Sequence, residues 1–443
     1  MLRTRQSRGR LSDVSEMANV LNITPLPAPV EDLRPTPGAI TNARPCRVFV
    51  PFTTPFLYGM ERAVIELFDA LRPDVEPYFL QGSLIFRDRP PIIREMLSRG
   101  FSISLLPDKH HWPRLARPKS IRHLYAMLKV SLRVNIAIFK GARSKDVLYV
   151  PGISAGSSSL LAALLYRVTG RRVIHHFHDL GTNNLLFPLW IPLVTDFIHN
   201  TEFGYEDIVQ KLPAIKRKRN IIVPYILEVD PRVPEDPEAR RLLEGKRNIF
   251  FVGQVSRHKG VDILLEAFKL VARQYPDVML HLVGGCGDDF RRELDREISS
   301  AGLGDRVRFW GFREDAIQLL RYAYLYVHSS PPSRFHESFG RSVVEAMALG
   351  VPTACFRSGA LQEIVLDGQT GILCDESPAA LQEGISRMLG DSDFRDRCGR
   401  NASRRYEQVY SREAVVPRWR DFFRITGGNS GDMGHVVNSP QIR

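Results

Sequence analysis

The 443-residue sequence predicts an α/β protein with two doubly wound domains, each a parallel sheet covered by helices on both faces. The chain is longer than the roughly 250–300 residues that one hydrophobic core usually supports. Short apolar runs typical of buried strands alternate with helical patterns in both halves. A stretch rich in proline and charged residues, 231–246, separates the two halves and predicts a linker.

The rest of the chain divides around this linker. Residues 1–44 contain several prolines and few large apolar side chains, so we expect a disordered tail there. The first domain is predicted at 45–230 and the second at 247–405. A C-terminal helix at 406–426, which can cross back to the first domain, and a disordered tail at 427–443 complete the predicted organisation.

Cysteine usage and hydropathy favour a cytoplasmic protein. The five cysteines are scattered without the spacing of a disulfide framework or a zinc knuckle, which indicates a reducing compartment. No window reaches the roughly 18 apolar residues that a membrane-spanning helix requires. The Arg-rich start of the chain lacks the apolar core of a secretory signal. We therefore expect a cytoplasmic location.

The excess positive charge is confined to the first half of the chain. Residues 1–220 hold 31 Lys and Arg against 18 Asp and Glu, whereas residues 221–443 hold 30 against 31. Within the first half, residues 109–145 hold ten Lys and Arg and no Asp or Glu, mixed with large apolar side chains such as Leu132 and Phe139. This mixture predicts a peripheral contact with an anionic membrane, at its inner face. A solvated basic helix face is the alternative, and no nucleic-acid partner is predicted because no nucleic-acid-binding module accompanies the charge.

In the first domain, two loops that follow strands supply candidate residues, because ligands of such sheets bind beyond the carboxyl ends of the strands. A loop with Tyr58 and Gly59 follows the strand expected at 47–51, and Gly59 lets a ligand approach the backbone closely. His178 follows the strand expected at 172–177, where a neutral imidazole can hydrogen-bond sugar hydroxyls. A connecting turn and a core histidine are the alternatives. No metal site is predicted there, because no Cys/His set completes a coordination shell.

In the second domain, Arg257 and Lys259 lie in a polar loop between a buried strand at 248–252 and a helix. Their charges suit an anionic diphosphate. A glycine-rich turn at 284–287 imitates a dinucleotide-binding fingerprint but lacks its third glycine, so no nicotinamide cofactor is predicted.

The stretch 335–352 gives the strongest functional signal. It follows a buried strand and opens a helix that we expect to begin near Ser338. The backbone N–H groups from Ser338 to Gly340 would then point out of the helix start and, with the helix dipole, suit a phosphate. Glu345 lies about a turn and a half into this helix, where its carboxylate can accept two hydrogen bonds from a ribose diol. Glu337 precedes the helix at the mouth of the pocket.

Three short runs carry a resemblance to a known family: Glu337-Ser338-Phe339-Gly340, Glu345-Ala346-Met347-Ala348 and Gly350-Val351-Pro352. They resemble the Glu-x7-Glu motif of the family 4 retaining glycosyltransferases of the GT-B fold, and the similarity extends over nearly all of residues 47–410. The resemblance implies two Rossmann-like domains that face each other across a cleft. The first would bind the acceptor and the second the nucleotide sugar.

The resemblance also implies roles for individual residues. The catalytic positions fall on His178 and Glu337, beside the donor sugar. Lys259 and the amides at 338–340 would hold the diphosphate, and Glu345 the ribose. By the resemblance, Gly59 lies in a loop near the phosphates and Phe312 in a loop near the base, whereas Arg257 is included by our own inference. The predicted donor-binding residues are Gly59, Arg257, Lys259, Phe312, Ser338, Phe339, Gly340 and Glu345.

Together these features predict a retaining, metal-independent enzyme without a cofactor. It would move a hexose from a nucleotide diphosphate sugar to a lipid-linked or membrane-bound glycan acceptor, in polysaccharide or glycolipid synthesis. Two positions depart from the family pattern: Tyr58 replaces the first of two glycines, and Gln254 replaces an arginine expected on the diphosphate. These departures keep an alternative open, a catalytically silent GT-B protein that acts as a sugar-nucleotide-binding or membrane scaffold.

Overall fold

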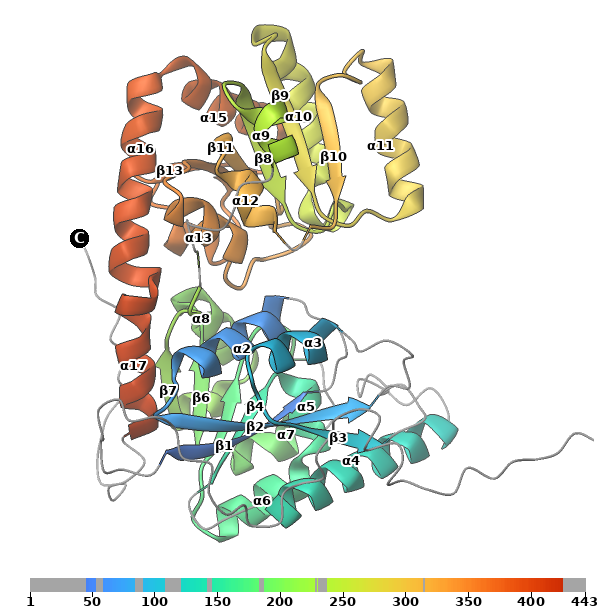
Figure 1. Ribbon diagram of the computed structural model, residues 1–443, viewed down its shortest axis with the longest axis vertical. Helices are drawn as coiled ribbons and strands as arrows, with labels where there is room; N and C mark the ends of the chain where they lie inside the picture. The colour runs from blue at the N-terminus through green and yellow to red at the C-terminus, as the bar shows by residue number, and fades with distance from the viewer. Residues whose placement is uncertain are drawn as a thin grey trace, which may run out of the picture.

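The computed structural model describes residues 45–52, 59–83, 91–107, 121–141, 146–182, 187–227, 229, 237–313 and 315–424. Within these ranges the chain forms two α/β domains, one above the other (Figure 1). The tails expected at 1–44 and 427–443, and Tyr58 in the first predicted loop, lie outside the described residues. None of the helices in the described ranges has the length and hydropathy of a membrane-spanning segment.

The first domain is built on a seven-stranded sheet with the order β3-β2-β1-β4-β5-β6-β7, and every pairing is parallel. Its strands are β1 (Cys46–Phe52), β2 (Val75–Ser83), β3 (Ile103–Pro107), β4 (Val147–Pro151), β5 (Val173–His176), β6 (Asp196–His199) and β7 (Arg219–Ile222). Its helices are α2 (Gly59–Ala70), α3 (Pro91–Ser98), α4 (Ile121–Gly141), α5 (Ile153–Ser158), α6 (Leu160–Val168), α7 (Phe187–Trp190) and α8 (Glu202–Lys211), with short 3-10 turns η1 (Ile191–Leu193) and η2 (Pro213–Arg217). The strand order reverses between β1 and β4, which is where doubly wound sheets bind ligands.

The second domain repeats this design with a six-stranded parallel sheet of order β10-β9-β8-β11-β12-β13. Its strands are β8 (Arg247–Val252), β9 (Val278–Val283), β10 (Val307–Gly311), β11 (Ala323–His328), β12 (Thr353–Phe356) and β13 (Gly371–Cys374). Its helical segments are α9 (Pro237–Leu243), η3 (Arg257–Lys259), α10 (Val261–Gln274), α11 (Asp288–Ser300), α12 (Ala316–Leu320), α13 (Arg341–Ala348), α14 (Leu361–Ile364), α15 (Pro378–Gly390), α16 (Ser392–Arg405) and the π-helical turn η4 (Tyr406–Tyr410). The chain ends in α17 (Arg412–Arg424).

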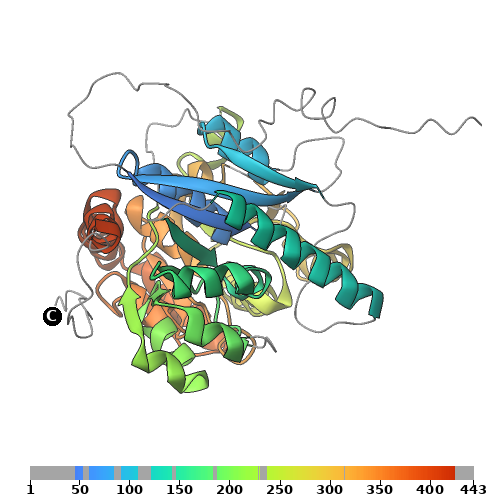
Figure 2. The ribbon, with the colours of Figure 1, turned by 90° about the horizontal axis from the view of Figure 1, so that it is seen from below.

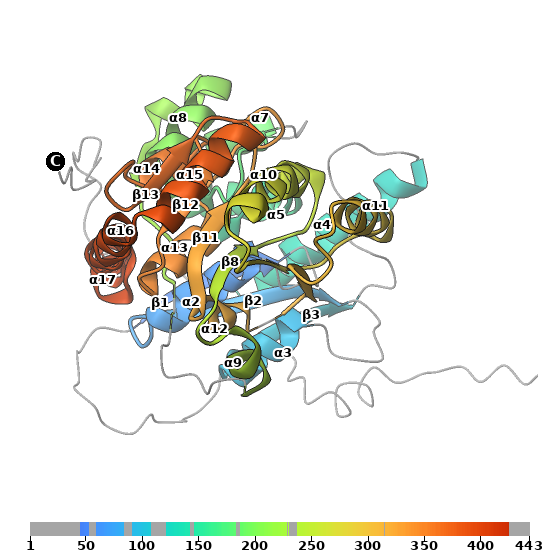
Figure 3. The same cartoon turned by 90° about the horizontal axis from the view of Figure 1, so that it is seen from above.

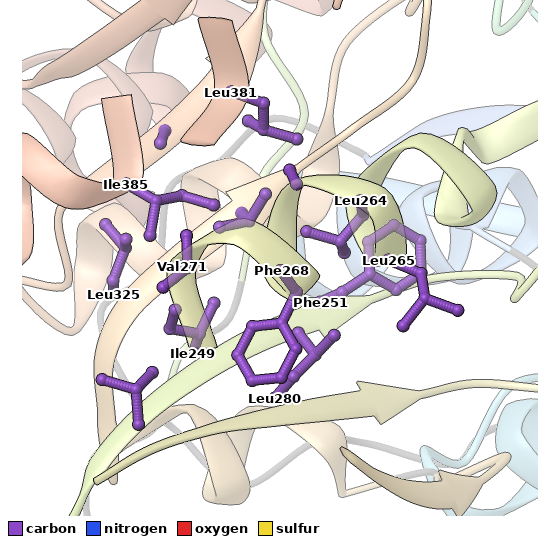
Figure 4. Packing of buried hydrophobic residues seen from close by; sticks show 14 of the residues in the cluster. Ile249, Phe251, Leu264, Leu265, Phe268, Val271, Leu280, Leu325, Leu381 and Ile385 are labelled. Carbon is purple, nitrogen blue, oxygen red and sulfur yellow. The ribbon is translucent and has the colours of Figure 1, made fainter. Parts of the chain in front are cut away.

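Both faces of each sheet are covered by apolar helix stripes, as the near-continuous apolar strands require. In the second domain α10 and α15 cover the face that points away from the first domain (Figure 3). There Phe268 of α10 packs over Ile249 and Phe251 of β8 (Figure 4). Because strand side chains alternate, Phe250 points to the opposite face and joins the cluster under α13.

Part of the predicted linker is helical, which corrects its boundary. Residues 237–243 form α9, and its Ala239 and Leu243 are buried in a core cluster of the second domain. Proline at 237 marked this stretch as linker, but proline is favoured in the first turn of a helix because its missing N–H has no partner there in any case.

The start of the motif helix is also corrected. We expected it near Ser338, but α13 begins at Arg341, and Gly340 is its N-cap residue with φ of 80°. A Cβ at residue 340 would lie 2.6 Å from Leu361 Cδ2. The left-handed backbone and the lack of space both require glycine here, so residues 338–340 approach the helix as a loop and do not form its first turn.

The last helix packs against the first domain. Helices α16 and α17 run along one side of the molecule from the second domain to the first (Figure 1). Val415, Trp419 and Phe423 of α17 are buried in the core cluster that includes α2 and α3. Trp419 also donates a hydrogen bond from Nε1 to the carbonyl oxygen of Pro224, at 3.3 Å. This helix therefore ties the two domains together at the edge of the molecule.

Truncation of that anchor should destabilise the protein. Trp419→Ala removes a side chain that is 1% exposed, so we expect a loss of about 3–5 kcal/mol in the free energy of unfolding of the first domain. Urea unfolding measures it, with Leu270→Ala on the outside of α10 as the control, where the side chain is 37% exposed. A loss no larger than that of the control would show that α17 is not part of this core.

Candidate functional site

The two domains meet where strands of both sheets end. Ser338, in the loop between β11 and α13, donates a hydrogen bond from Oγ to the carbonyl oxygen of His178, just beyond β5, at 3.0 Å. The carbonyl oxygen of Ser338 accepts one from Thr201, just beyond β6, at 2.9 Å. Phe339 packs edge to face on Tyr225 of the first domain, with ring centroids 4.8 Å apart. The motif loop is thus held against the carboxyl end of the first sheet, where α/β sheets bind their ligands.

Glu337 is the centre of a buried polar cluster. Its Oε1 accepts hydrogen bonds from Lys259 Nζ at 2.6 Å, His328 Nε2 at 2.8 Å and Ser330 Oγ at 2.6 Å. Burial alone would raise the pKa of Glu337, but His328 and Lys259 outweigh it and hold the pKa well below its usual value of 4.5. The carboxylate is therefore charged at neutral pH and acts as an acceptor of hydrogen bonds, not as an acid.

The loop that carries Lys259 is fixed by Gly260. This glycine has φ of 68°, and a Cβ on it would lie 1.9 Å from the carbonyl oxygen of Ser329. Ser329 Oγ in turn donates to the carbonyl oxygen of Lys259, at 2.9 Å. The Nζ of Lys259 also lies 4.0 Å from the centre of the Phe335 ring, a cation–π contact. Only glycine lets this loop approach the end of β11 closely enough for Lys259 to reach Glu337.

Arg257, predicted to help with a diphosphate, faces away from this cluster. Its guanidinium pairs with Glu293 of α11 and lies 3.4 Å from Asp262. The hydrogen bond to Glu293 raises the pKa of Arg257. The side chain is more than half exposed. A pairing with a helix 36 residues further along the chain could not be foreseen from the loop sequence.

Glu345 takes part in an ion triad that joins the domains. Arg341 donates from both terminal nitrogens to the two carboxylate oxygens of Glu66 on α2, each at 2.8 Å, and from Nε to Glu345 Oε1, also at 2.8 Å. Burial alone would lower the pKa of Arg341, but the two glutamates raise it, so the guanidinium stays charged. Sequence reasoning missed Arg341 and Glu66. The i,i+4 spacing of Arg341 and Glu345 was the available signal, whereas nothing in the sequence pairs Arg341 with Glu66.

His178 is buried beside the motif loop. Its Nδ1 hydrogen-bonds to Tyr225 Oη at 2.8 Å, and no described residue hydrogen-bonds to its Nε2. Burial, and then the neighbouring His176 and His175, hold its pKa well below 6.5, so the ring is neutral. His178 lines a small cavity together with Ser338 and Asp179, and its Nε2 has capacity for one more hydrogen bond.

The other histidines near His178 have structural partners. His176 hydrogen-bonds to Tyr149 and, at 2.9 Å, to Asn200. His175 lies 3.2 Å from Trp190 Nε1, which donates to its Nδ1. In the part of the chain that the structure describes, no group of three or more His, Cys, Asp or Glu is arranged to hold a metal ion.

Two predicted donor-binding residues are exposed. Gly59 is the exposed first residue of α2, and a Cβ on it would meet nothing within 4 Å. Phe312 follows β10 and is 68% exposed. The structure thus brings together His178, Lys259, Glu337 and the 338–340 loop.

A cleft of about 580 Å³ adjoins this group of residues. The first domain contributes Asp179, Leu180, Gly181, Asp207 and Lys211, and the second contributes Pro332, Ser333, Arg334, Phe335, His336 and Ser338. Its volume is within the usual range for small-molecule sites. Most of its lining surface is apolar, and carboxylates, cations and hydroxyls among the lining residues can hydrogen-bond to a ligand.

Comparison with known proteins shows what the second domain is similar to. A family model described as Glycosyl transferases group 1 matches residues 233–405. The chain is 27% identical to spore coat protein SA of Bacillus subtilis, over 51% of this chain and 62% of that one. It is 28% identical to D-rhamnosyltransferase WbpZ of Pseudomonas aeruginosa (56% and 66%) and 32% identical to phosphatidyl-myo-inositol mannosyltransferase of Mycobacterium tuberculosis (36% and 43%). The chain thus matches only 43–66% of the length of these relatives.

Solved structures establish the fold of the whole described chain. Anabaena Alr3699/HepE, in complex with UDP and glucose, superimposes with a TM-score of 0.67 at 19% identity and covers 86% of this chain and 100% of its own. A glycosyltransferase from Rickettsia africae ESF-5 gives 0.71 at 14% identity, with 88% and 100% covered. The chain therefore has the GT-B fold predicted from its sequence, and its second domain is similar to the group 1 glycosyltransferases.

The charge state of Glu337 gives a pH-dependent prediction. Because the folded state lowers the pKa of Glu337 below 4.5, this group stabilises the protein above that pH, and the contribution is lost progressively as the pH falls below it. Glu337→Gln should therefore be less stable than wild type at pH 7, and the difference should shrink towards pH 3.5. Urea unfolding at several pH values measures this.

The matched control is Glu383→Gln on α15, where the carboxylate is exposed. Its difference from wild type should stay small at every pH. A Glu337→Gln difference that is the same at pH 7 and pH 3.5 would mean that Glu337 is not a charged partner of Lys259 and His328.

Proposed function

We propose that this protein is a retaining, metal-independent glycosyltransferase that transfers a hexose from a nucleotide diphosphate sugar to a lipid-linked or membrane-bound glycan acceptor. The observation that carries the proposal is the charged Glu337 carboxylate. It contacts Lys259 and precedes Ser338, which hydrogen-bonds to His178 of the first domain, in a domain similar to the group 1 glycosyltransferases. Such a site offers fixed donors and acceptors to a sugar and the Lys259 ammonium to its phosphates.

The donor diphosphate would lie beside Lys259 and the first turn of α13. Lys259 supplies a positive charge, and the amides at the start of the helix add the positive end of its dipole. Gly340 supplies the left-handed turn that brings the motif loop to the start of this helix. The structurally similar Anabaena protein was solved with UDP and glucose, which supports a nucleoside diphosphate sugar as the donor class here. Glu345 is placed on the same helix to accept hydrogen bonds from a ribose diol.

The sugar would lie between Glu337 and His178. Three donors already orient Oε1 of Glu337, so the carboxylate can accept from a sugar hydroxyl in a fixed direction. The unpartnered Nε2 of His178 can exchange a hydrogen bond with the same sugar. In the front-face reaction that we propose, the leaving phosphate takes the proton of the acceptor hydroxyl. Retention then needs no second carboxylate as a base, and Lys259 stabilises the developing charge on the phosphate.

The acceptor would enter through the 580 Å³ cleft between the domains. One relative is named a phosphatidyl-myo-inositol mannosyltransferase, which supports a glycolipid acceptor. A cytoplasmic enzyme at the inner face of a membrane, without a cofactor, fits this role. A silent sugar-nucleotide scaffold is the second candidate, because Gln254 leaves the diphosphate without a cation at that position.

Slow donor hydrolysis tests the proposal directly. The wild type should release nucleotide from at least one of a panel of UDP-, GDP- and ADP-sugars, whereas nucleotide binding without release from any donor would favour the scaffold.

Two variants locate the diphosphate. Lys259→Ala should reduce nucleotide release at least about tenfold, since it removes a charge worth roughly 1.5–3 kcal/mol to a bound anion. Gln254→Arg, the matched change that adds a charge to the same loop region, should bind donor equally or more tightly. Full activity in Lys259→Ala would place the diphosphate elsewhere.

A further inference from the structure

Exposed apolar side chains gather on two neighbouring helices of the first domain. In the part of the chain that the structure describes, ten large hydrophobic residues are exposed, and six of them belong to α4 and α6. These six, which we call the α4–α6 face, are Leu132 (53%), Ile136 (42%), Phe139 (43%), Leu161 (53%), Leu164 (49%) and Val168 (72%). Exposed apolar residues scattered singly need no explanation, but a group of this size does.

Helical spacing aligns these residues into two stripes. On α4 they recur at i, i+4 and i+7, and on α6 at i, i+3 and i+7, so each set lies along one side of its helix. Asn135 joins the helices: it donates to the carbonyl oxygen of Ser158 at 3.0 Å and accepts from the amide of Ala162 at 2.6 Å. The opposite sides of both helices fill the core with residues such as Ile138 and Tyr166. The exposed stripes therefore belong to firmly packed helices.

The α4–α6 face points away from the second domain. Both helices lie at the end of the first domain that is opposite to the interdomain junction (Figure 1), and both are in view when the molecule is seen from below (Figure 2). A flat body seated on this face would leave the cleft between the domains open.

The charged side chains that the structure describes on the two helices have a single sign. They are Arg133, Lys140 and Arg167. Arg133 and Lys140 each follow a residue of the apolar stripe, Leu132 and Phe139, so they lie about 100° further round the helix and flank it. Apolar side chains bordered by cations are the pattern of a helix that lies in the interface of an anionic bilayer.

We propose that the α4–α6 face seats the protein on an anionic phospholipid bilayer, with the apolar stripes inserted among the acyl chains and the flanking cations on the headgroups. The inference rests on the proposed function and extends it, because it keeps the protein at the membrane that holds the proposed acceptor. A second copy of the chain fits less well, since a twofold contact would bring the like charges of both copies together. A nucleic acid would match the cations but not the apolar stripes.

Co-sedimentation with vesicles tests the proposal. Wild type should bind vesicles of mixed phosphatidylglycerol and phosphatidylcholine and bind pure phosphatidylcholine vesicles weakly, with a loss in raised salt. The triple variant Leu161→Ser, Leu164→Ser and Val168→Ser lies outside the basic segment 109–145 and keeps every charge. It should lose binding about a hundredfold, because apolar insertion contributes strongly to partition. Arg133→Glu with Lys140→Glu should lose about tenfold or more.

Matched controls distinguish an effect specific to the α4–α6 face from the effect of removing exposed apolar side chains or positive charges elsewhere. Leu97→Ser with Leu270→Ser removes exposed apolar side chains from α3 and α10, and Arg273→Glu with Arg404→Glu reverses exposed charges in the second domain. Both controls should bind vesicles like wild type. Release of nucleotide from free donor, measured on the same samples, should be unchanged in every variant.

The outcomes distinguish this inference from the proposed function. Vesicle binding without nucleotide release from any donor would contradict the proposed function but support bilayer binding by the α4–α6 face. Bilayer binding by the α4–α6 face would be contradicted if wild type never sedimented with anionic vesicles. It would also be contradicted if the triple variant sedimented as fully as wild type. If the triple variant instead converted a dimeric wild type to monomers, the face would be a contact between copies and the proposal would be wrong.

Discussion

The interaction on which the site depends is the hydrogen bonding of one buried carboxylate, Glu337. A buried charge is costly unless it is paired and fully hydrogen-bonded, and here Lys259, His328 and Ser330 converge on the same oxygen. These donors come from the loop after β8 and from the end of β11, which are adjacent strands. The carboxylate therefore holds two loops of the second domain in a fixed relation, and the close packing at Gly260 makes that relation possible.

A second ion cluster relates the site to the arrangement of the domains. Arg341, at the first position of α13, binds Glu345 on its own helix and Glu66 on α2 of the first domain. In the proposed function Glu345 also binds the ribose of the donor. Arg341 thus contacts both the opposite domain and a carboxylate that the proposed function assigns to the donor. In that function, donor binding and the contact between the domains would share this side chain.

The alternation of strands and helices in both halves was predicted from the sequence, because strands of a parallel sheet covered on both faces are continuous apolar runs. Sequence reasoning also assigned Lys259 and Glu337 to one ligand-binding site, which stays a prediction. It could not show that they contact each other, since they are 78 residues apart and only the pairing of β8 with β11 brings them together. The start of α13 was missed because Gly340 adopts a left-handed conformation, which the motif alone does not reveal. The pairing of Arg341 with Glu66 spans 275 residues and needed the full fold.

The most direct test of this account is a crystal structure of the protein with UDP or GDP, whichever binds more tightly. The account predicts phosphate oxygens within hydrogen-bond distance of Lys259 Nζ and of the first-turn amides of α13, with the ribose hydroxyls on Glu345. A nucleotide bound away from α13, or phosphates that make no contact with Lys259, would contradict the assignment of the Glu337 cluster as the donor site.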